Sequence, residues 1–178
     1  LVKLLSLEEF PTQGEIKFDS VTSQKLSKRQ TLKWRQKLGL VFQDLRLLKD
    51  KTIFENVTLP LRIRGESAKK VNKKTTQILG NFGLLLKRNS YPHQLSTGER
   101  QKVALARALV SEPILFLADE PTGNLDLSAT DEIIDLLLQI HAQGTTILLT
   151  TNQEIVAQRL QVKISQGKIL EIELGRLK

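Results

Sequence analysis

The sequence predicts an α/β protein with a mostly parallel sheet and an inserted helical lobe. In the last third of the chain, strand-sized apolar runs alternate with helical patterns, which is typical of parallel strands whose two faces are covered. Between about residues 52 and 110 the pattern is almost entirely helical, so we expect this stretch to be a lobe inserted into the core. A length of 178 residues suits one domain with such an insert.

Turn residues and periodicity define the elements of the first 51 residues. Leu1 to Leu5 starts without a capping residue and is interpreted as the middle of an element. Gly14 to Phe18 alternates as a strand does, and Lys25 to Lys37 has a helical spacing that we expect Gly39 to end. Leu40 to Phe42 is predicted to be a short buried strand.

The same signals continue to the end of the chain. Helices are predicted at Thr52 to Ile63, Glu66 to Leu79, Ser96 to about Val110, Leu127 to Ile140 and Gln153 to Leu160. Further strands are predicted at Ile114 to Ala118 and Thr146 to Leu149, a loop at Tyr91 to His93, and a hairpin from Val162 to Ile172 that turns at Gln166-Gly167.

Composition excludes several classes of protein. Hydrophobic residues make up 40% and charged residues 26%, which is typical of a globular chain and excludes a disordered one. No apolar run is long enough to span a bilayer, and residues 1–7 do not have the pattern of a signal peptide, so we exclude membrane-spanning and secreted proteins. Zero cysteines exclude disulfides, a thiol nucleophile and cysteine-ligated metals.

Charge is distributed unevenly along the chain. Residues 1–110 hold 22 Lys+Arg and 9 Asp+Glu, whereas residues 111–178 hold 5 and 10. The basic residues from Lys25 to Lys37 have two interpretations, a solvated face, which the sequence favours, and contact with anionic lipid. Aromatic residues are scarce, which argues against a single-stranded nucleic-acid groove, and we expect no nucleic-acid partner. The acidic second half suits a site for a divalent cation.

Two carboxylates follow the strand predicted at Ile114 to Ala118. They are expected at the C-terminal edge of the sheet, where open α/β sheets bind ligands. Asp119 suits Mg²⁺, which is usually held by one or two carboxylates plus substrate phosphates, and Glu120 could accept a proton from an attacking water. Taken alone, this pair is better explained as a surface feature.

A second candidate lies at the start of the helix predicted from Ser96. Ser96 and Glu99 fit the S-x-x-E capping box, which is sufficient to explain them structurally. The same helix start also offers free N–H groups and the positive end of the helix dipole, and Gly98 would let a phosphate approach the backbone closely.

In combination these segments resemble the nucleotide-binding domain of ATP-binding cassette (ABC) proteins. The residues that carry the resemblance are Leu95-Ser96-Thr97-Gly98-Glu99 at the start of a long helix, and Asp119-Glu120-Pro121-Thr122-Gly123-Asn124-Leu125-Asp126 after an apolar strand. Phe42-Gln43-Asp44 resembles the Q-loop that precedes the helical lobe in this family. The resemblance covers essentially the whole chain and implies a P-loop NTPase (RecA-like) core.

The resemblance also implies roles for individual residues. Gln43 would contact Mg²⁺ and the attacking water, Asp119 would hold Mg²⁺ through water, and Glu120 would be the general base. The signature and D-loop residues expected to bind nucleotide are Ser96, Thr97, Gly98, Glu99 and Asp126. Because the signature segment acts on ATP held by another copy, the resemblance implies ATP hydrolysis by a head-to-tail homodimer with ATP and Mg²⁺ as cofactors.

Within the family, the stretch Gln43 to Asp50 is most similar to the cell-division branch (FtsE). Ala118 to Asp126 is shared by that branch and by the lipoprotein-release (LolD) and macrolide-export (MacB) branches, which stay as alternatives. The resemblance implies a peripheral subunit on the cytoplasmic face of the inner membrane, paired with an integral, permease-like subunit of FtsX type.

The sequence departs from the family pattern in three places. No G-x-x-x-x-G-K-[ST] segment occurs, and in the family this P-loop lies immediately before the segment that matches Leu1 to Leu5. We therefore expect the chain to be N-terminally incomplete and to bind ATP poorly as it stands. Asn152 occupies the place of a His that contacts the γ-phosphate in the family, and Asn cannot carry a proton charge. Thr97 replaces a Gly, which is a milder change.

These departures leave a second hypothesis open, a cassette that binds nucleotide and dimerises as a scaffold without hydrolysis. Asn152 favours the scaffold, whereas Gln43, Glu120 and Asp126 favour the ATPase.

Overall fold

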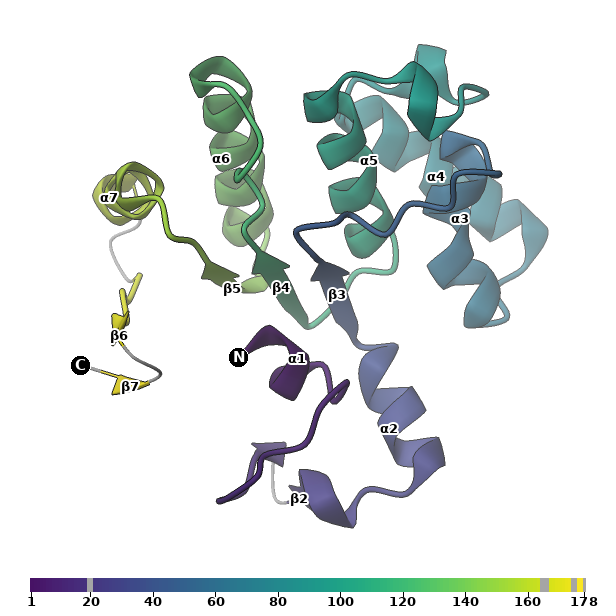
Figure 1. Ribbon diagram of the computed structural model, residues 1–178. Coiled ribbons are helices and arrows are strands. Elements are labelled where there is room, and N and C mark those ends of the chain that lie inside the picture. The colour runs from purple at the N-terminus through teal and green to yellow at the C-terminus, as the bar shows by residue number, and fades with distance from the viewer. Residues whose placement is uncertain (19–20, 164–166, 174–175, 178) are drawn as a thin grey trace.

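A computed structural model of the chain describes residues 1–18, 21–163, 167–173 and 176–177. Its centre is a three-stranded parallel sheet in the order β3-β4-β5, formed by Leu38–Val41, Leu115–Asp119 and Thr146–Thr150 (Figure 1). The pairing of β3 with β4 begins with Leu38 opposite Leu115, and the pairing of β4 with β5 ends with Asp119 opposite Thr150. The predicted α/β fold with a mostly parallel sheet is therefore confirmed.

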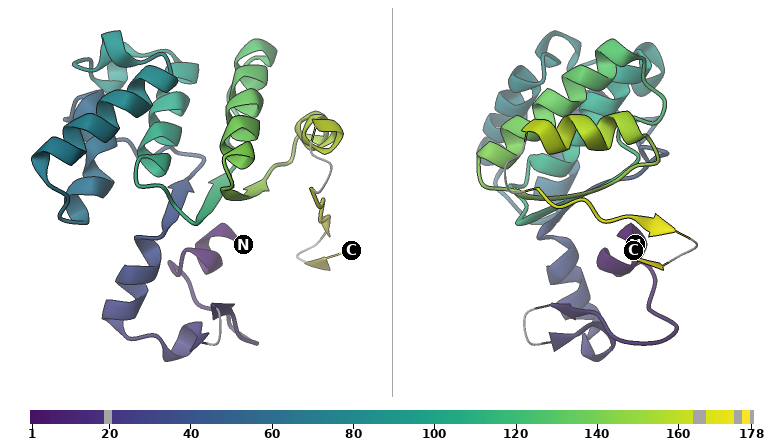
Figure 2. Two further views of the ribbon diagram at one scale, coloured as in Figure 1. Left: turned by 180° about the vertical axis from the view of Figure 1, so that it is seen from behind. Right: turned by 90° about the vertical axis from the view of Figure 1, so that its left-hand side faces the viewer.

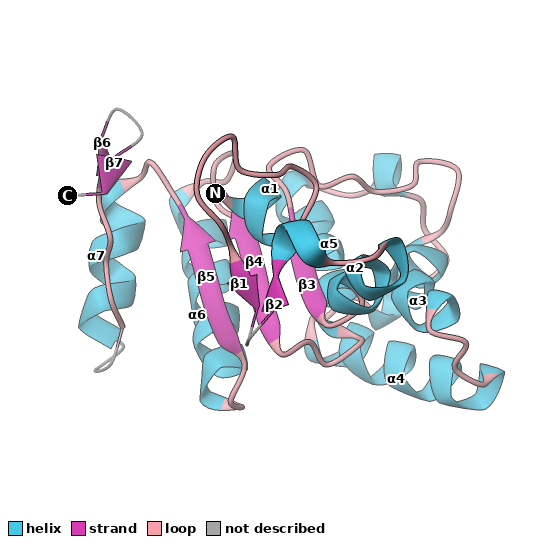
Figure 3. Ribbon diagram, turned by 90° about the horizontal axis from the view of Figure 1, so that it is seen from below, coloured by secondary structure: helices cyan, strands magenta, loops and turns pink. Residues whose placement is uncertain are grey.

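The two faces of the sheet are covered by different helices. α5 (Thr97–Leu109) and α6 (Leu127–Ala142) lie on one face, and the short α1 (Val2–Leu5) lies on the other (Figures 1 and 3). Because successive side chains of a strand point to opposite faces, Phe116 belongs to the large core under α5 and α6, whereas Leu117 packs in a smaller cluster with Val2. Both side chains are completely buried.

Three helices lie between β3 and β4 in the chain: α3 (Ile53–Ile63), α4 (Ala68–Asn81) and α5. Each begins at a hydroxyl residue that accepts a backbone N–H, which satisfies one of the free donors of a helix start. Short 3₁₀ turns at Leu85–Lys87 and Pro92–Gln94 connect α4 to α5. The predicted helices of this stretch are confirmed, and the bounds of a separate lobe at about 52–110 stay a prediction.

The region before β3 projects from the opposite side of the sheet (Figure 2). It contains a small antiparallel ladder of β1 (Lys17–Phe18) and β2 (Val21–Thr22), a 3₁₀ turn at Ser23–Lys25, and α2 (Lys28–Arg35). The predicted strand at 14–18 and helix at 25–37 are therefore both shorter than expected. Gly39 was expected to end the helix, and this is wrong, because Gly39 lies within β3.

The C-terminal part differs most from expectation. α7 (Glu154–Lys163) continues through Val162, so the hairpin predicted to begin there is wrong. Part of its turn, Gln166, lies outside the described residues, and an antiparallel pair forms later, between β6 (Ile172–Glu173) and β7 (Arg176–Leu177). Within the described ranges, no helix combines the length and the apolar character needed to cross a bilayer.

Candidate functional site

The carboxylate pair stands at the C-terminal end of β4, as predicted. Asp119 is the last residue of the strand, and Glu120 follows it with a φ of 48°. A positive φ is costly for a residue with a side chain, so the surrounding structure has to stabilise it. The backbone N–H of Glu120 donates to the Thr150 carbonyl of the neighbouring strand at 3.0 Å, which holds the turn in place.

The segment that follows β5 binds both carboxylates. The Thr150 hydroxyl donates to Asp119 Oδ1 at 2.6 Å. The backbone N–H of Asn152 donates to Glu120 Oε1 at 2.6 Å, and the Thr151 hydroxyl donates to Glu120 Oε2 at 3.3 Å. Both carboxylates are half-buried and thereby oriented at the sheet edge. Asn152 does lie beside Glu120, but it makes this contact through its backbone.

Gln43 reaches the same edge from the other side of β4. It follows β3 by two residues, and Val41, the last residue of β3, pairs with Ala118 just before the carboxylates. The side chain of Gln43 is exposed there. The structure thus brings Gln43, Asp119, Glu120 and Asn152 to one edge of the sheet.

The turn that carries Gln43 is held by an arginine that the motifs did not indicate. Arg107 of α5 donates to the carbonyl oxygens of Leu45 and Arg46 at 2.6 and 2.7 Å. Leu45 and Arg46 both have positive φ values, 56° and 43°. Burial lowers the pKa of the Arg107 guanidinium from its ordinary value, and Asp44 partly opposes this effect. Arg107 therefore fixes the turn at residues 43–46, which we call the Q-loop turn after the motif it resembles, to α5.

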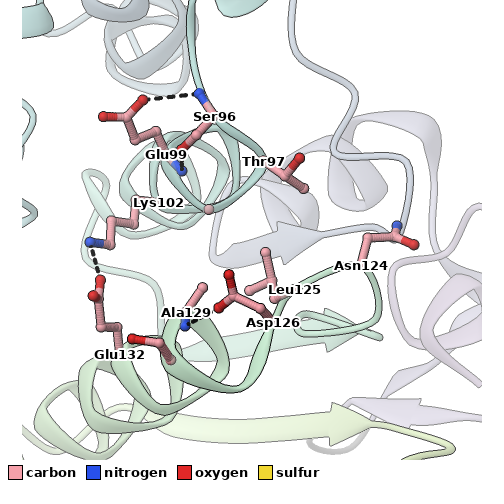
Figure 4. Close-up of a pocket in the computed structure, with 11 residues that line it drawn as sticks. Ser96, Thr97, Glu99, Lys102, Asn124, Leu125, Asp126, Ala129 and Glu132 are labelled. Carbon is pink, nitrogen blue, oxygen red and sulfur yellow. Dashed lines mark hydrogen bonds and ion pairs between the residues drawn. The ribbon is translucent and has the colours of Figure 1, made fainter.

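That helix start forms the second part of the site. Ser96 Oγ accepts the N–H of Glu99 at 3.2 Å, and Glu99 Oε2 accepts the N–H of Ser96 at 3.0 Å, so the predicted capping box is present (Figure 4). Glu99 also forms an ion pair with Lys87. The Lys87 ammonium and the Ser96 N–H both lower the pKa of the Glu99 carboxyl, so the cap keeps its negative charge.

A pocket of about 440 Å³ separates this helix start from α6 (Figure 4). Asp126 lies across it, where it caps α6 by accepting the N–H of Ala129 at 2.8 Å. Gly98 faces the same space, and its nearest neighbour across the pocket is Ala129. The pocket is lined by Ser96, Thr97, Gly98, Glu99, Lys102, Asn124, Leu125, Asp126, Ser128, Ala129 and Glu132. The predicted signature and D-loop residues are thus brought together around one pocket. This pocket is separate from the carboxylate edge.

The oxygen ligands at the carboxylate edge suit Mg²⁺ that is bound together with a nucleotide. They do not suit a metal ion whose ligands all come from the protein. Among the described residues, no group of three or more His, Asp or Glu side chains is placed to hold a metal ion. Asp119 offers one oxygen beside the oxygen bonded to Thr150. Mg²⁺ is usually bound through one or two carboxylates, waters and substrate phosphates, so Asp119 fits an ion that arrives with a nucleotide.

Thr150, Thr151 and Arg107 are site residues that the sequence motifs missed. The signal for the threonines was their place directly after the strand expected at Thr146 to Leu149, next to the strand that carries Asp119. Arg107 gave no such signal, because its partners are distant in sequence.

Comparisons with known proteins agree with this geometry. The family described as ABC transporter matches residues 1–123. The cell division ATP-binding protein FtsE of Mycobacterium tuberculosis is 40% identical over 176 residues, which cover 99% of this chain and 74% of that protein. The methionine import ATP-binding protein MetN of Haemophilus influenzae is 42% identical over 175 residues, which cover 96% of this chain and 51% of that protein. The chain thus spans about half the length of such MetN relatives.

Two solved structures have similar folds. One is a dimeric bacterial ABC transporter cassette, with a TM-score of 0.79 and 34% identity over 88% of this chain and 70% of that chain. The other is a dimeric cassette in a post-hydrolysis state with ADP and Pi bound, with a TM-score of 0.79 and 33% identity over the same shares.

Proposed function

Because the chain belongs to the ABC transporter family, we propose that it is the ATP-hydrolysing subunit of a membrane complex of the cell-division (FtsE) type, with an FtsX-like integral partner. The observation that carries the proposal is the Asp119-Glu120 pair, oriented at the end of β4 by hydrogen bonds from Thr150, Thr151 and Asn152. An ordered carboxylate pair at this edge suits hydrolysis of the phosphoanhydride bond of a bound nucleotide.

In the proposed reaction each carboxylate has a separate role. Glu120 accepts a proton from the water that attacks the γ-phosphate, and Oε2 is the oxygen available for it, because its bond to Thr151 is longer than the bond from Asn152 to Oε1. Asp119 would hold Mg²⁺, and Gln43 would orient the attacking water from the neighbouring strand end. Mg²⁺ would supply neutralisation of the phosphate charge.

The pocket between α5 and α6 supports a site completed by a second copy of the chain. It exposes the start of α5 and Gly98, where backbone N–H groups can bind a phosphate. We propose that Ser96, Thr97 and Gly98 bind the γ-phosphate of ATP held by the other copy, with Glu99 maintaining the cap and Asp126 closing the pocket. Two dimeric cassettes among the similar structures support this arrangement.

The decisive experiment compares ATP turnover of the full-length protein with that of a Glu120→Gln variant. Removing a general base lowers turnover by about 10²–10⁴-fold, so we expect a loss of that size while ATP-driven dimerisation persists. Because these 178 residues contain no G-x-x-x-x-G-K-[ST] segment, reading the coding DNA upstream of Leu1 comes first. Glu171→Gln, which removes an exposed carboxylate that is not among the candidate site residues, is the matched control.

The alternative function, a nucleotide-dependent scaffold, is favoured by Asn152. If wild type and Glu120→Gln show the same background turnover while both dimerise with ATP, the scaffold replaces the ATPase. An Asn152→His variant tests the same point from the other direction. Faster turnover in that variant would show that Asn152 slows a working enzyme.

The cell-division assignment is tested separately from the chemistry. MetN proteins are as similar as FtsE, so a methionine-import cassette is a second candidate, and lipoprotein release and macrolide export are further ones. Co-purification of the full-length protein from membranes with an FtsX-like subunit would support the proposal. Loss of methionine uptake on deletion of the gene, without a division defect, would replace it.

A further inference from the structure

α2 carries an unbalanced positive charge. Residues 20–43 contain six Lys or Arg residues and no Asp or Glu. Lys28, Arg29 and Lys33 lie on the exposed part of α2, and Lys37 follows it. We call these four cations, together with the exposed Leu32 between them, the α2 surface. It lies on the part of the molecule that projects away from the strand ends with the carboxylates (Figures 1 and 2).

The other side of α2 is attached to the molecule. The Trp34 ring packs on Phe18, with ring centroids 4.2 Å apart, and its indole N–H donates to the Leu5 carbonyl at 3.4 Å. Arg35 donates to the carbonyls of Ser6 and Leu7 at 3.1 and 2.6 Å, so it is used internally. These contacts fix the orientation of the helix, and the cations of the α2 surface are therefore held on its outer side.

The exposed side combines cations with one large apolar residue. Leu32 is 60% exposed, and Lys28 and Arg29 lie one turn before it on the same face. Within the described ranges, none of the four cations of the α2 surface takes part in an ion pair. Unpaired cations around an exposed aliphatic residue suit contact with an anionic membrane surface, because the cations attract lipid headgroups and the aliphatic side chain can enter the interface.

The other lysine-rich helix, α4, shows the contrasting case. Lys70 pairs with Glu66, and Lys74 pairs with Glu112. Carboxylates therefore neutralise half of its four lysines, Lys69, Lys70, Lys73 and Lys74. Both helices are basic and exposed. α4 therefore serves as a reference for a lysine-rich helix that is only a solvated face.

We propose that the α2 surface binds the headgroups of anionic phospholipids and holds the chain against a membrane. Lysine and arginine side chains reach the phosphates, and Leu32 enters the interface between headgroups and acyl chains. The surface suits lipid better than single-stranded nucleic acid, because the single aromatic residue of α2, Trp34, is turned inward against Phe18 and is not available to stack on bases. The proposal does not depend on the nucleotide site.

The test measures binding of the full chain to vesicles of phosphatidylcholine mixed with phosphatidylglycerol, and to vesicles of phosphatidylcholine alone. We expect binding to the mixed vesicles at about 0.1 M salt and its loss near 1 M, where screening acts within a few ångströms. Trp34 is the only tryptophan and lies on α2, so quenching of its emission by headgroup-labelled lipid reports contact at this helix.

Two triple variants of equal charge change separate the α2 surface from net charge. Lys28→Gln/Arg29→Gln/Lys33→Gln is expected to weaken binding about 100-fold, since each basic residue near an anionic surface contributes about fivefold. Lys69→Gln/Lys70→Gln/Lys73→Gln on α4 is expected to change binding less than about threefold, because long-range attraction is screened. All six side chains are exposed, and circular dichroism verifies that both variants fold.

Three outcomes would overturn the proposal. Wild type that does not bind the mixed vesicles, or binds both vesicle types equally, excludes a headgroup site. Equal weakening by the two triple variants means that net charge, and not the α2 surface, causes binding. Release from vesicles by duplex DNA at equal phosphate concentration would assign the surface to nucleic acid. ATP turnover is expected to be unchanged in both triple variants, so failure here leaves the proposed ATPase standing.

Discussion

The two parts of the candidate site are built in opposite ways. At the start of α5, four consecutive residues complete the geometry, because Ser96 and Glu99 cap each other's backbone N–H groups. At the carboxylate edge, Asp119 and Glu120 are held by residues about thirty positions later in the sequence, Thr150 to Asn152. The first part is a local device, whereas the second exists only when β4 and β5 pair.

This difference determines how robust each part is to mutation. A helix cap loses one hydrogen bond when its hydroxyl is removed, and the helix can fray without moving the sheet. The carboxylate edge depends on strand register and on a strained residue, Glu120, so a change in packing alters its chemistry as well as its stability.

The largest effect is expected where α5 meets the sheet and fixes the two parts relative to each other. A Cβ on Gly39 of β3 would lie 2.7 Å from the Ala108 carbonyl oxygen of α5. Gly39→Ala should therefore destabilise folding by about 1–3 kcal/mol, measured by urea denaturation. Gly80→Ala in α4, where the space around the Cβ is open, should instead stabilise by about 0.5–1 kcal/mol. Equal effects would refute the packing argument.

The next effect is expected at the carboxylate edge itself. Thr150→Val keeps the shape of the side chain but removes the hydroxyl that donates to Asp119 at 2.6 Å. A hydrogen bond to a charged group contributes about 1.5–3 kcal/mol, and the half-buried site places the loss near 1.5 kcal/mol. Thr146→Val at the exposed start of the same strand should change the free energy of unfolding by less than about 0.5 kcal/mol. A neutral Thr150→Val would show that Asp119 does not need this donor.

Arg107 connects the two parts through the Q-loop turn. Lysine lacks the planar, forked guanidinium that donates from two separate nitrogens to the Leu45 and Arg46 carbonyls. We expect Arg107→Lys to lower kcat of the full-length protein about tenfold, or about 1.4 kcal/mol, with KM for ATP unchanged. Arg62→Lys, at an exposed arginine of α3, is the control. A raised KM at constant kcat would assign Arg107 to nucleotide binding instead.

The smallest effect is expected at the helix cap formed by Ser96 and Glu99. Ser96→Ala should cost about 1 kcal/mol by loss of the cap, and Ser96→Thr should retain most of the stability because it keeps the hydroxyl. Thermal unfolding measures both. A cost for Ser96→Ala larger than that of Thr150→Val would reverse the contrast between the two parts.

Elements whose signals are local were predicted well from the sequence. The helix after Ser96 has the capping box that its S-x-x-E pattern indicates, and the helix predicted from Thr52 begins there, with Thr52 as its cap. The buried strand before Asp119 was recognised by its apolar run. Prediction is wrong where distant parts of the chain decide the structure. Gly39 does not end a helix but lies within β3, where the close approach of α5 explains why the residue is glycine.

The sequence by itself determined the fold class, the family and the types of the principal site residues, because apolar periodicity, caps and motif spacing depend on neighbouring residues. Tertiary structure decided which groups contact those residues. Thr150 meets Asp119 through parallel strand pairing, and Arg107 meets the Q-loop turn through packing of α5 on the sheet. Tertiary contacts also decided which side of α2 is exposed, because the partners of Trp34 and Arg35 come from earlier parts of the chain. Such contacts follow from the packing of whole elements, which local patterns do not encode.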